Sequence, residues 1–196
     1  MREEVAESVR ESATAGALLV VVAALAVLTG RTFLFPSLGP SAFLLATQPS
    51  APASSPRRVA GGHAVGILAG LVAYHGVASG PLLAVPVSTL AVPAPTLTAS
   101  APSLTAPPPA LTAASIALAA SGVVSVVLTT AGMVAADLRH APACATTLIV
   151  SLGLLSSFAD ALLIAVAIGV LLVTHRALTR AKVAPARTAA ERARNR

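Results

Sequence analysis

Long runs of apolar and small residues, each closed by charges or prolines, dominate the chain. They cover residues 13–29, 59–79, 111–136 and 158–174. Because an α-helix rises about 1.5 Å per residue, each run, alone or with one flanking turn, can cross a hydrocarbon core of about 30 Å. The pattern therefore predicts four long membrane helices.

Two shorter apolar segments follow the first and the third of these runs. The first, RTFLFPSLGPSAFLLATQ, is interrupted by Pro36, Gly39 and Pro40, and the second covers residues 142–157. Proline suits the first turn of a helix, where its missing N–H is not needed, but it disrupts a helix interior. We therefore expect one short helix to begin at about Pro40 and another at Pro142.

This order divides the chain into two halves, residues 13–80 and 111–175, each with a long, a short and a long segment. Three crossings per half make the second half run opposite to the first, as in many transporters. The predicted fold is an all-α integral membrane protein with about six membrane segments in two inverted three-segment halves. Around this single transmembrane domain, 13–175, we expect a cytoplasmic lead-in, 1–12, and a basic tail, 176–196. The charge-free, proline-rich residues 81–110 are expected to form a solvent-exposed linker.

Positive charges set the predicted orientation. If the short segments cross, Arg57, Arg58, Arg139 and the tail all fall on one side. Since Lys and Arg favour the cytoplasmic side, we expect a multi-pass protein of the cell (inner) membrane, with both termini cytoplasmic and the linker outside. Four crossings would move Arg57 and Arg58 outside, so six are preferred.

The composition agrees with a membrane protein and not with a soluble globule. Hydrophobic residues make up 56% of the chain, charged residues 10%, and the mean hydropathy is +0.85. The net charge of +6 does not indicate nucleic-acid binding, because seven of the 13 Lys and Arg residues lie in the tail, which has no aromatic residues for base stacking. A single Cys144 excludes an intramolecular disulfide.

Three small residues at every fourth position mark one face of the 59–79 run. Gly62, Gly66 and Gly70 form a smooth stripe along a helix. In membranes such a stripe lets a second helix approach closely.

The two proline-initiated helices suggest where a ligand binds. A helix N-terminus has unpaired amides and about half a positive charge, so two such ends converging near the bilayer midplane suit a small anion. The predicted substrate-binding residues are small residues, hydroxyls and cationic partners: Ser37, Gly39, Pro40, Ser41, His63, Arg139, His140, Pro142, Ala143 and Thr146. No catalytic residue, metal site or cofactor is predicted.

Several of these groups also have a purely structural explanation. Arg139 can simply neutralise Asp137 in a cytosolic loop, and Pro40 and Pro142 can be plain kinks. His63 fits a membrane interface as well as a site.

Polar residues elsewhere fit ordinary positions near helix ends. His75 and His175 are expected at wet helix ends, and Asp160 in a polar outer turn, with an intramembrane proton carrier as the alternative for Asp160.

Two sequence blocks resemble the HPP family of integral membrane proteins. They are SLGPSAFLLATQPSAPASSPRRVAGGH and RHAPACATTLIVSLG, in the expected order. The signature His-Pro-Pro is His140-Ala141-Pro142 here, and Pro40 stands where alanine is commoner. The resemblance implies nitrite transport, as for some members in plastid or cyanobacterial membranes. It touches Gly39, Ser41, Ala42, Pro56, Arg57, Gly61, Gly62, His63, His140, Pro142, Ala143 and Thr146.

The function predicted from the sequence is a transporter or channel for a small inorganic anion, similar to nitrite. Its expected partners are the anion and membrane lipid, and nucleic acid is not expected. Whether the chain forms a homo-oligomer stays open. One alternative is a non-transporting membrane scaffold or sensor that uses its basic tail. Another is an intramembrane serine hydrolase built on the GPSA sequence, but Ala42 replaces the glycine expected after Ser41, and no histidine on a Gly-rich span evidently faces that serine.

Overall fold

The computed structural model describes residues 1–31, 34–79 and 113–194. Within these ranges the chain is helical and has no strand: α1 (Arg2–Thr29), α2 (Leu38–Thr47), the 3-10 turn η1 (Pro52–Ser54), α3 (Pro56–Ala73), the π-helical turn η2 (Tyr74–Ala78), α4 (Ala113–Ala135), α5 (Ala143–Ser151) and α6 (Phe158–Arg194). The predicted all-α membrane fold is confirmed. The linker 81–110 lies outside the described residues, so its exposure stays a prediction.

Four helices are long and apolar enough to cross a membrane among the residues described. They are Arg2–Thr29, Pro56–Ala78, Ala114–Ala135 and Phe158–Ala181, which correspond to the four predicted runs. The first and the last extend further than their apolar runs, because α1 begins at Arg2 and α6 ends at Arg194. The helices therefore continue through the predicted boundaries of the membrane domain.

The two short helices begin as their prolines predict. α2 has 10 residues and α5 has 9, so they are about 15 and 14 Å long, half the thickness of a bilayer core. α2 begins at Leu38, which places Pro40 in its first turn, where no backbone hydrogen bond is lost. Pro142 directly precedes α5. Both are thus half-membrane helices in length, and each is buried along one face, while Phe43 of α2 and Leu148 of α5 are exposed.

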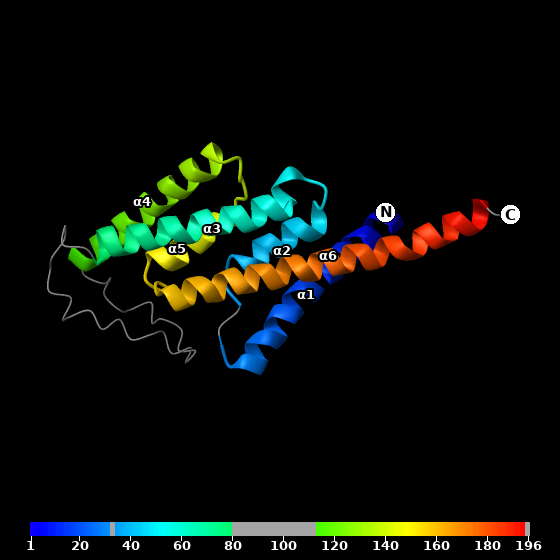
Figure 1. The fold of residues 1–196 in the computed structure, drawn as a ribbon, viewed down its shortest axis with the longest axis horizontal. Helices are drawn as coiled ribbons and strands as arrows, with labels where there is room; N and C mark the ends of the chain where they lie inside the picture. Colours follow the sequence, from blue (N-terminus) through cyan, green and yellow to red (C-terminus); the bar gives the residue numbers. More distant parts are fainter. Residues whose placement is uncertain (32–33, 80–112, 195–196) are drawn as a thin grey trace.

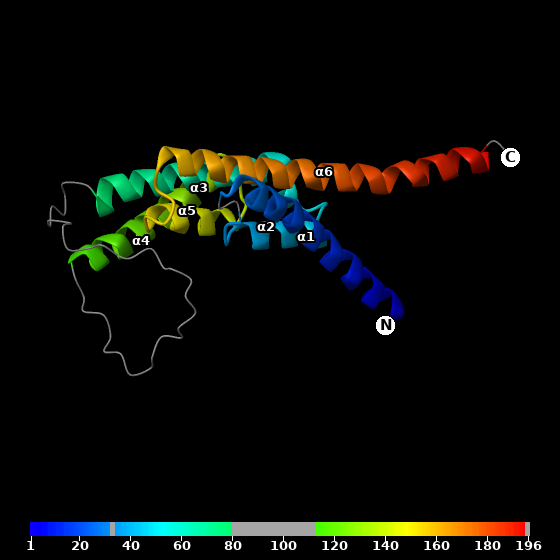
Figure 2. The same cartoon turned by 90° about the horizontal axis from the view of Figure 1, so that it is seen from below.

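The helix directions show the two inverted halves. In Figure 1, α1 runs one way, α2 turns back and α3 follows the direction of α1, whereas α4, α5 and α6 repeat this order in reverse. α1 begins and α6 ends at the same end of the molecule in Figures 1 and 2.

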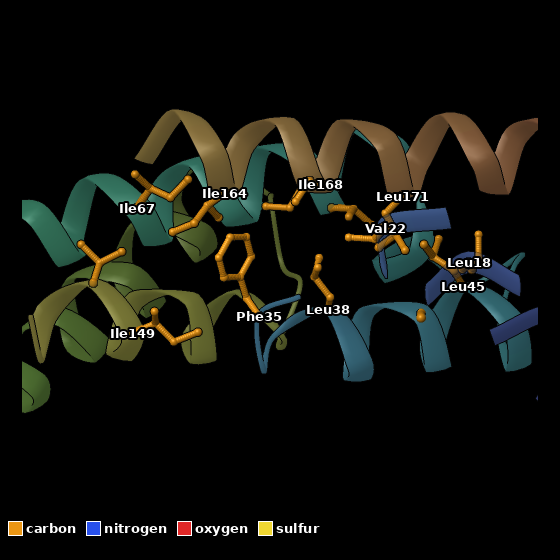
Figure 3. Packing of buried hydrophobic residues seen from close by; sticks show 14 of the residues in the cluster. Leu18, Val22, Phe35, Leu38, Leu45, Ile67, Ile149, Ile164, Ile168 and Leu171 are labelled. Carbon is orange, nitrogen blue, oxygen red and sulfur yellow. The ribbon is translucent and has the colours of Figure 1, made fainter. Parts of the chain in front are cut away.

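The third helix of each half packs mainly against the other half, an arrangement we call the exchange of third helices. α5 packs against α4 of its own half and most extensively against α3 of the other, while α2 packs against α1 and also contacts α6. Figure 3 shows the apolar core on the α2 side, where side chains of α1, α2 and α6 meet. Its labelled members are Leu18, Val22, Phe35, Leu38, Leu45, Ile67, Ile149, Ile164, Ile168 and Leu171.

α5 packs directly against the glycine stripe of α3, which confirms the predicted close approach of a second helix. A Cβ atom at Gly66 would lie 2.8 Å from the carbonyl oxygen of Ala143, and one at Gly70 would lie 2.7 Å from Cβ of Val150. The Thr147 hydroxyl donates to the carbonyl oxygen of Gly66. With no side chain between them, the two helix backbones are in direct contact.

An ion-pair cluster joins the start of α3 to the loop after α4. Nη2 of Arg58 lies 2.8 and 2.7 Å from the two carboxylate oxygens of Asp137, and Arg57 donates to the carbonyl of Ala136 at 3.1 Å. Hydrogen bonding from Arg58 lowers the pKa of the Asp137 carboxyl below its usual range. These charges therefore share one end of the molecule, as the charge pattern required.

Candidate functional site

The site lies where the two short helices begin. Ser37 precedes α2 and Ser41 is its fourth residue, while Thr146 is the fourth residue of α5. The hydroxyl oxygens of Ser37 and Thr146 are 2.9 Å apart, so the two helix N-termini meet directly. From this junction α2 and α5 run in opposite directions in Figure 1.

Two histidines complete the junction, one from each half. Nε2 of His63, on α3, and Nε2 of His140, in the loop before α5, each lie 3.1 Å from Oγ of Ser41. Nδ1 of His63 lies 2.7 Å from Oγ1 of Thr146. The two rings have centroids 5.1 Å apart. The five side chains Ser37, Ser41, His63, His140 and Thr146 are hereafter called the junction network, and none is more than 1% exposed.

The loop between α2 and α3 fixes His140 from the other side. Nδ1 of His140 lies 2.9 Å from the carbonyl oxygen of Ala53, which belongs to η1. A carbonyl oxygen only accepts hydrogen bonds, so Nδ1 carries the hydrogen. His140 is therefore held in a single orientation, with Nε2 toward Ser41.

The glycine stripe explains how His63 reaches the network. A Cβ atom at Gly62 would lie 2.9 Å from Cβ of His140, so only a residue without a side chain lets the loop before α5 lie this close to α3. His63, the next residue, then faces Ser41 and Thr146. The expectation that no histidine on the Gly-rich span faces Ser41 is wrong for this reason.

The junction network holds hydrogen-bond donors and no acid. Within the described part of the chain, the hydrogen bonds of its members go to one another and to backbone carbonyls, never to Asp or Glu. Across the described part of the chain, no group of three or more His, Cys, Asp or Glu residues is placed to hold a metal ion. Imidazoles, hydroxyls and two positive helix ends favour an anion over a cation.

The structure brings together five of the ten residues predicted for the site and places the others around or away from it. Ala143 and Pro142 are buried beside the junction network, Gly39 is half-buried and Pro40 is exposed. Arg139 lies at the surface, with a side chain 62% exposed and Nη1 at 3.4 Å from Asp137. Arg139 therefore forms an ion pair in a surface loop, as the purely structural explanation expects.

Polar residues outside the network have ordinary local roles. The carboxylate of Asp160 accepts from the Ser157 hydroxyl at 2.6 Å and from its backbone N–H at 3.1 Å, and so caps the start of α6. His75 is exposed, with Nε2 3.2 Å from the carbonyl oxygen of Ser156.

Nearly the whole chain matches a known protein family. The family model described as HPP, transmembrane region, matches residues 2–189. The chain belongs to the HPP family. No curated protein and no solved structure matches it.

The two blocks that carry the HPP resemblance meet in space. Ser41 and His63 come from the first block, and His140 and Thr146 come from the second, at a separation of up to 109 residues from Ser37 to Thr146. In this HPP protein the junction network is thus built from the residues that make its sequence resemble the family.

Proposed function

We propose that this HPP protein is a membrane transporter or channel for a small inorganic anion, similar to nitrite, that binds at the junction of α2 and α5. The observation that carries the proposal is the meeting of two half-membrane helices by their N-termini, in contact through Ser37 and Thr146. In transporters, broken helices whose N-termini point at one place commonly mark the site for an anionic group.

The electrostatics of the junction support an anion. Each helix end contributes about half a positive charge, and the hydroxyls and imidazoles gathered there can donate hydrogen bonds to an anion. No carboxylate contacts the network among the described residues, so nothing there repels an anion. Because the five side chains are buried and bonded to one another, solute entry requires that some of these bonds be exchanged for bonds to the solute.

Flux measurements test the proposal. Purified protein in liposomes should carry at least one of nitrite, nitrate, formate and chloride faster than protein-free vesicles do. Ser41→Ala removes the hydroxyl shared by both histidines, and the loss of a hydrogen bond to a charged group of about 1.5–3 kcal/mol corresponds to a flux lower by about tenfold or more. Ser50→Ala, at an exposed turn, is the matched control and should transport as wild type does.

The result that rejects the proposal is wild-type flux equal to that of protein-free vesicles for all four anions. The scaffold or sensor alternative, which uses the basic tail, is tested separately: deletion of residues 176–196 that leaves solute flux intact speaks against it.

One contact favours a second candidate, the serine hydrolase. Ser41 lies at hydrogen-bond distance from two imidazoles, as a nucleophile and its base do. However, no carboxylate orients either ring: Nδ1 of His63 meets Thr146, and Nδ1 of His140 meets a backbone carbonyl. We expect no enzymatic activity. Labelling of wild type by a fluorophosphonate probe, absent in Ser41→Ala, would show the opposite.

A further inference from the structure

The hydroxyl of Ser41 has more acceptors around it than hydrogens to give. Its oxygen lies 3.0 Å from the carbonyl oxygen of Ser37, 3.1 Å from Nε2 of His63 and 3.1 Å from Nε2 of His140. A serine hydroxyl has one hydrogen and two lone pairs. It can therefore donate to one neighbour and accept from two others, so the protonation of the imidazoles decides whether all three bonds form.

His140 cannot relieve this shortage while it is neutral. Its Nδ1 carries the hydrogen that is donated to the carbonyl of Ala53. A neutral imidazole has one N–H, so Nε2 of His140 is then a bare acceptor. Thr146 donates its own hydrogen to Ser37, so Nδ1 of His63 donates to Thr146, and Nε2 of a neutral His63 is a bare acceptor as well. Nε2 of His63 and Nε2 of His140 both require the single hydrogen of Ser41, and one of these buried nitrogens is left without it. Leaving a buried polar group unsatisfied is unfavourable.

One added proton removes the competition. When Nε2 of His140 is also protonated, His140 donates to Ala53 through Nδ1 and to Ser41 through Nε2, and the Ser41 hydroxyl is free to donate to Nε2 of His63. The carbonyl of Ser37 keeps the backbone N–H of Ser41. The only bond made is N–H, and the proton is returned to water when the bond breaks. The backbone geometry around Ser41 and His140 thus fits the network with one proton more than its neutral count.

Among the described residues, none that faces His140 carries a negative charge to balance that proton. Of the elements packed around it, α3 presents His63, α2 and α5 present hydroxyls, and η1 presents a carbonyl. The charged groups nearest in sequence, Asp137 and Arg139, lie at the surface and pair with each other and with Arg58. Burial opposes an uncompensated imidazolium, so hydrogen bonding favours the proton and burial resists it.

A monovalent anion at the junction resolves this opposition. We propose that the junction network takes up one proton, on Nε2 of His140, together with each anion, so that the protein moves both as an electroneutral pair. This inference rests on the proposed function, because it specifies how the same site binds its solute. By linkage, the proton raises the affinity for the anion by the same factor as the anion raises the affinity for the proton.

The test measures both fluxes in the same vesicles. Proteoliposomes that contain the pH-sensitive dye pyranine are given an inward gradient of nitrite, and internal pH and nitrite uptake are followed together, with the leak of protein-free vesicles subtracted. Wild type is expected to take up one proton per nitrite, at a rate unchanged by a potassium diffusion potential set with valinomycin. His140→Gln should lower the ratio of protons to nitrite at least about tenfold. His75→Gln is the matched control and should keep the wild-type ratio, because His75 is exposed and its Nε2 meets the carbonyl oxygen of Ser156, just before α6 and outside the junction network.

The outcomes separate the two proposals. Nitrite uptake by wild type without proton uptake overturns the inference and leaves anion transport standing. No uptake of nitrite or of the other three anions overturns anion transport, and the inference with it. If His140→Gln does not fold, ¹⁵N NMR of histidine-labelled wild type decides: nitrite should raise the fraction of a buried imidazole that is protonated at both nitrogens, and no change at saturating nitrite overturns the inference.

Discussion

Replacement of Gly66 by alanine should push α5 away from α3 and weaken the whole second half. The new Cβ atom would lie 2.8 Å from the carbonyl oxygen of Ala143, a contact with backbone that cannot rotate away. Overpacking of this kind costs about 1–3 kcal/mol. The shift also strains the bond from Thr147 to the Gly66 carbonyl, which contributes about 1 kcal/mol. Alanine gains about 1 kcal/mol over glycine inside a helix, so the net loss of stability is about 1–3 kcal/mol.

The single cysteine supplies the assay. Cys144 is a free thiol near the start of α5 and is half-buried, so a thiol-reactive fluorescent dye reports when α5 comes loose on heating. A loss of about 1–3 kcal/mol corresponds to a Tm lower by about 2–10 °C for a chain of this size. Gly169→Ala is the matched control, since a Cβ at Gly169 meets nothing within 4 Å, and its Tm should equal or exceed that of wild type. A Gly66→Ala protein as stable as Gly169→Ala would refute the close seat of α5 on α3.

Two further predictions concern the charged end and the orientation of the chain. Hydrogen bonding from Arg58 is the main cause that lowers the pKa of Asp137 in the folded protein. The ion pair that links α3 to the loop after α4 is therefore fully formed above the ordinary carboxyl range near pH 4, and its stabilising contribution is lost as the pH falls below that range. Asp137→Asn should therefore lower the Tm at pH 7 but much less at pH 3, and an equal loss at both values would contradict the ion-pair role. In a Cys144→Ala background, Ser100→Cys should react with a membrane-impermeant thiol reagent in intact cells, and reaction only after permeabilisation would reject the predicted orientation.

The elements of the fold could be predicted from the sequence because each has a local physical cause. Apolar length gave the four long helices, and proline chemistry gave the starts of the two short ones, with α2 beginning two residues before Pro40. The glycine spacing indicated a close helix contact. α1 begins at Arg2, well before the apolar run that starts at residue 13, because the charged residues do not end the helix: Arg10 and Glu7 pair along its surface at 3.6 Å.

The partners in the site could be predicted only in part. A glycine stripe shows that some helix comes close, but it does not say which one, and here α5 of the other half takes the position. The burial of His63 depends on which helix packs against the stripe. The Ala53 carbonyl that orients His140 is a backbone atom of a Ser- and Pro-rich turn, and no residue type marks it in the sequence. Sequence alone therefore grouped Arg139 with His140, although the backbone turns Arg139 to the surface.

The exchange of third helices sets an order of events during synthesis. α3 is synthesised before α4 and α5, so at that stage only Ser41 of the same half is available to His63, through Nε2, while Nδ1 and the smooth glycine face lack their final neighbours. A polar atom in hydrocarbon without a partner is unfavourable, which keeps the first half from settling into its final position alone. α5 arrives last among the site helices and supplies both a hydroxyl for His63 and a surface for the glycines. A chain that stops before α5 would thus expose an unfinished polar helix, the kind of defect by which membrane quality control can tell an incomplete copy from a complete one.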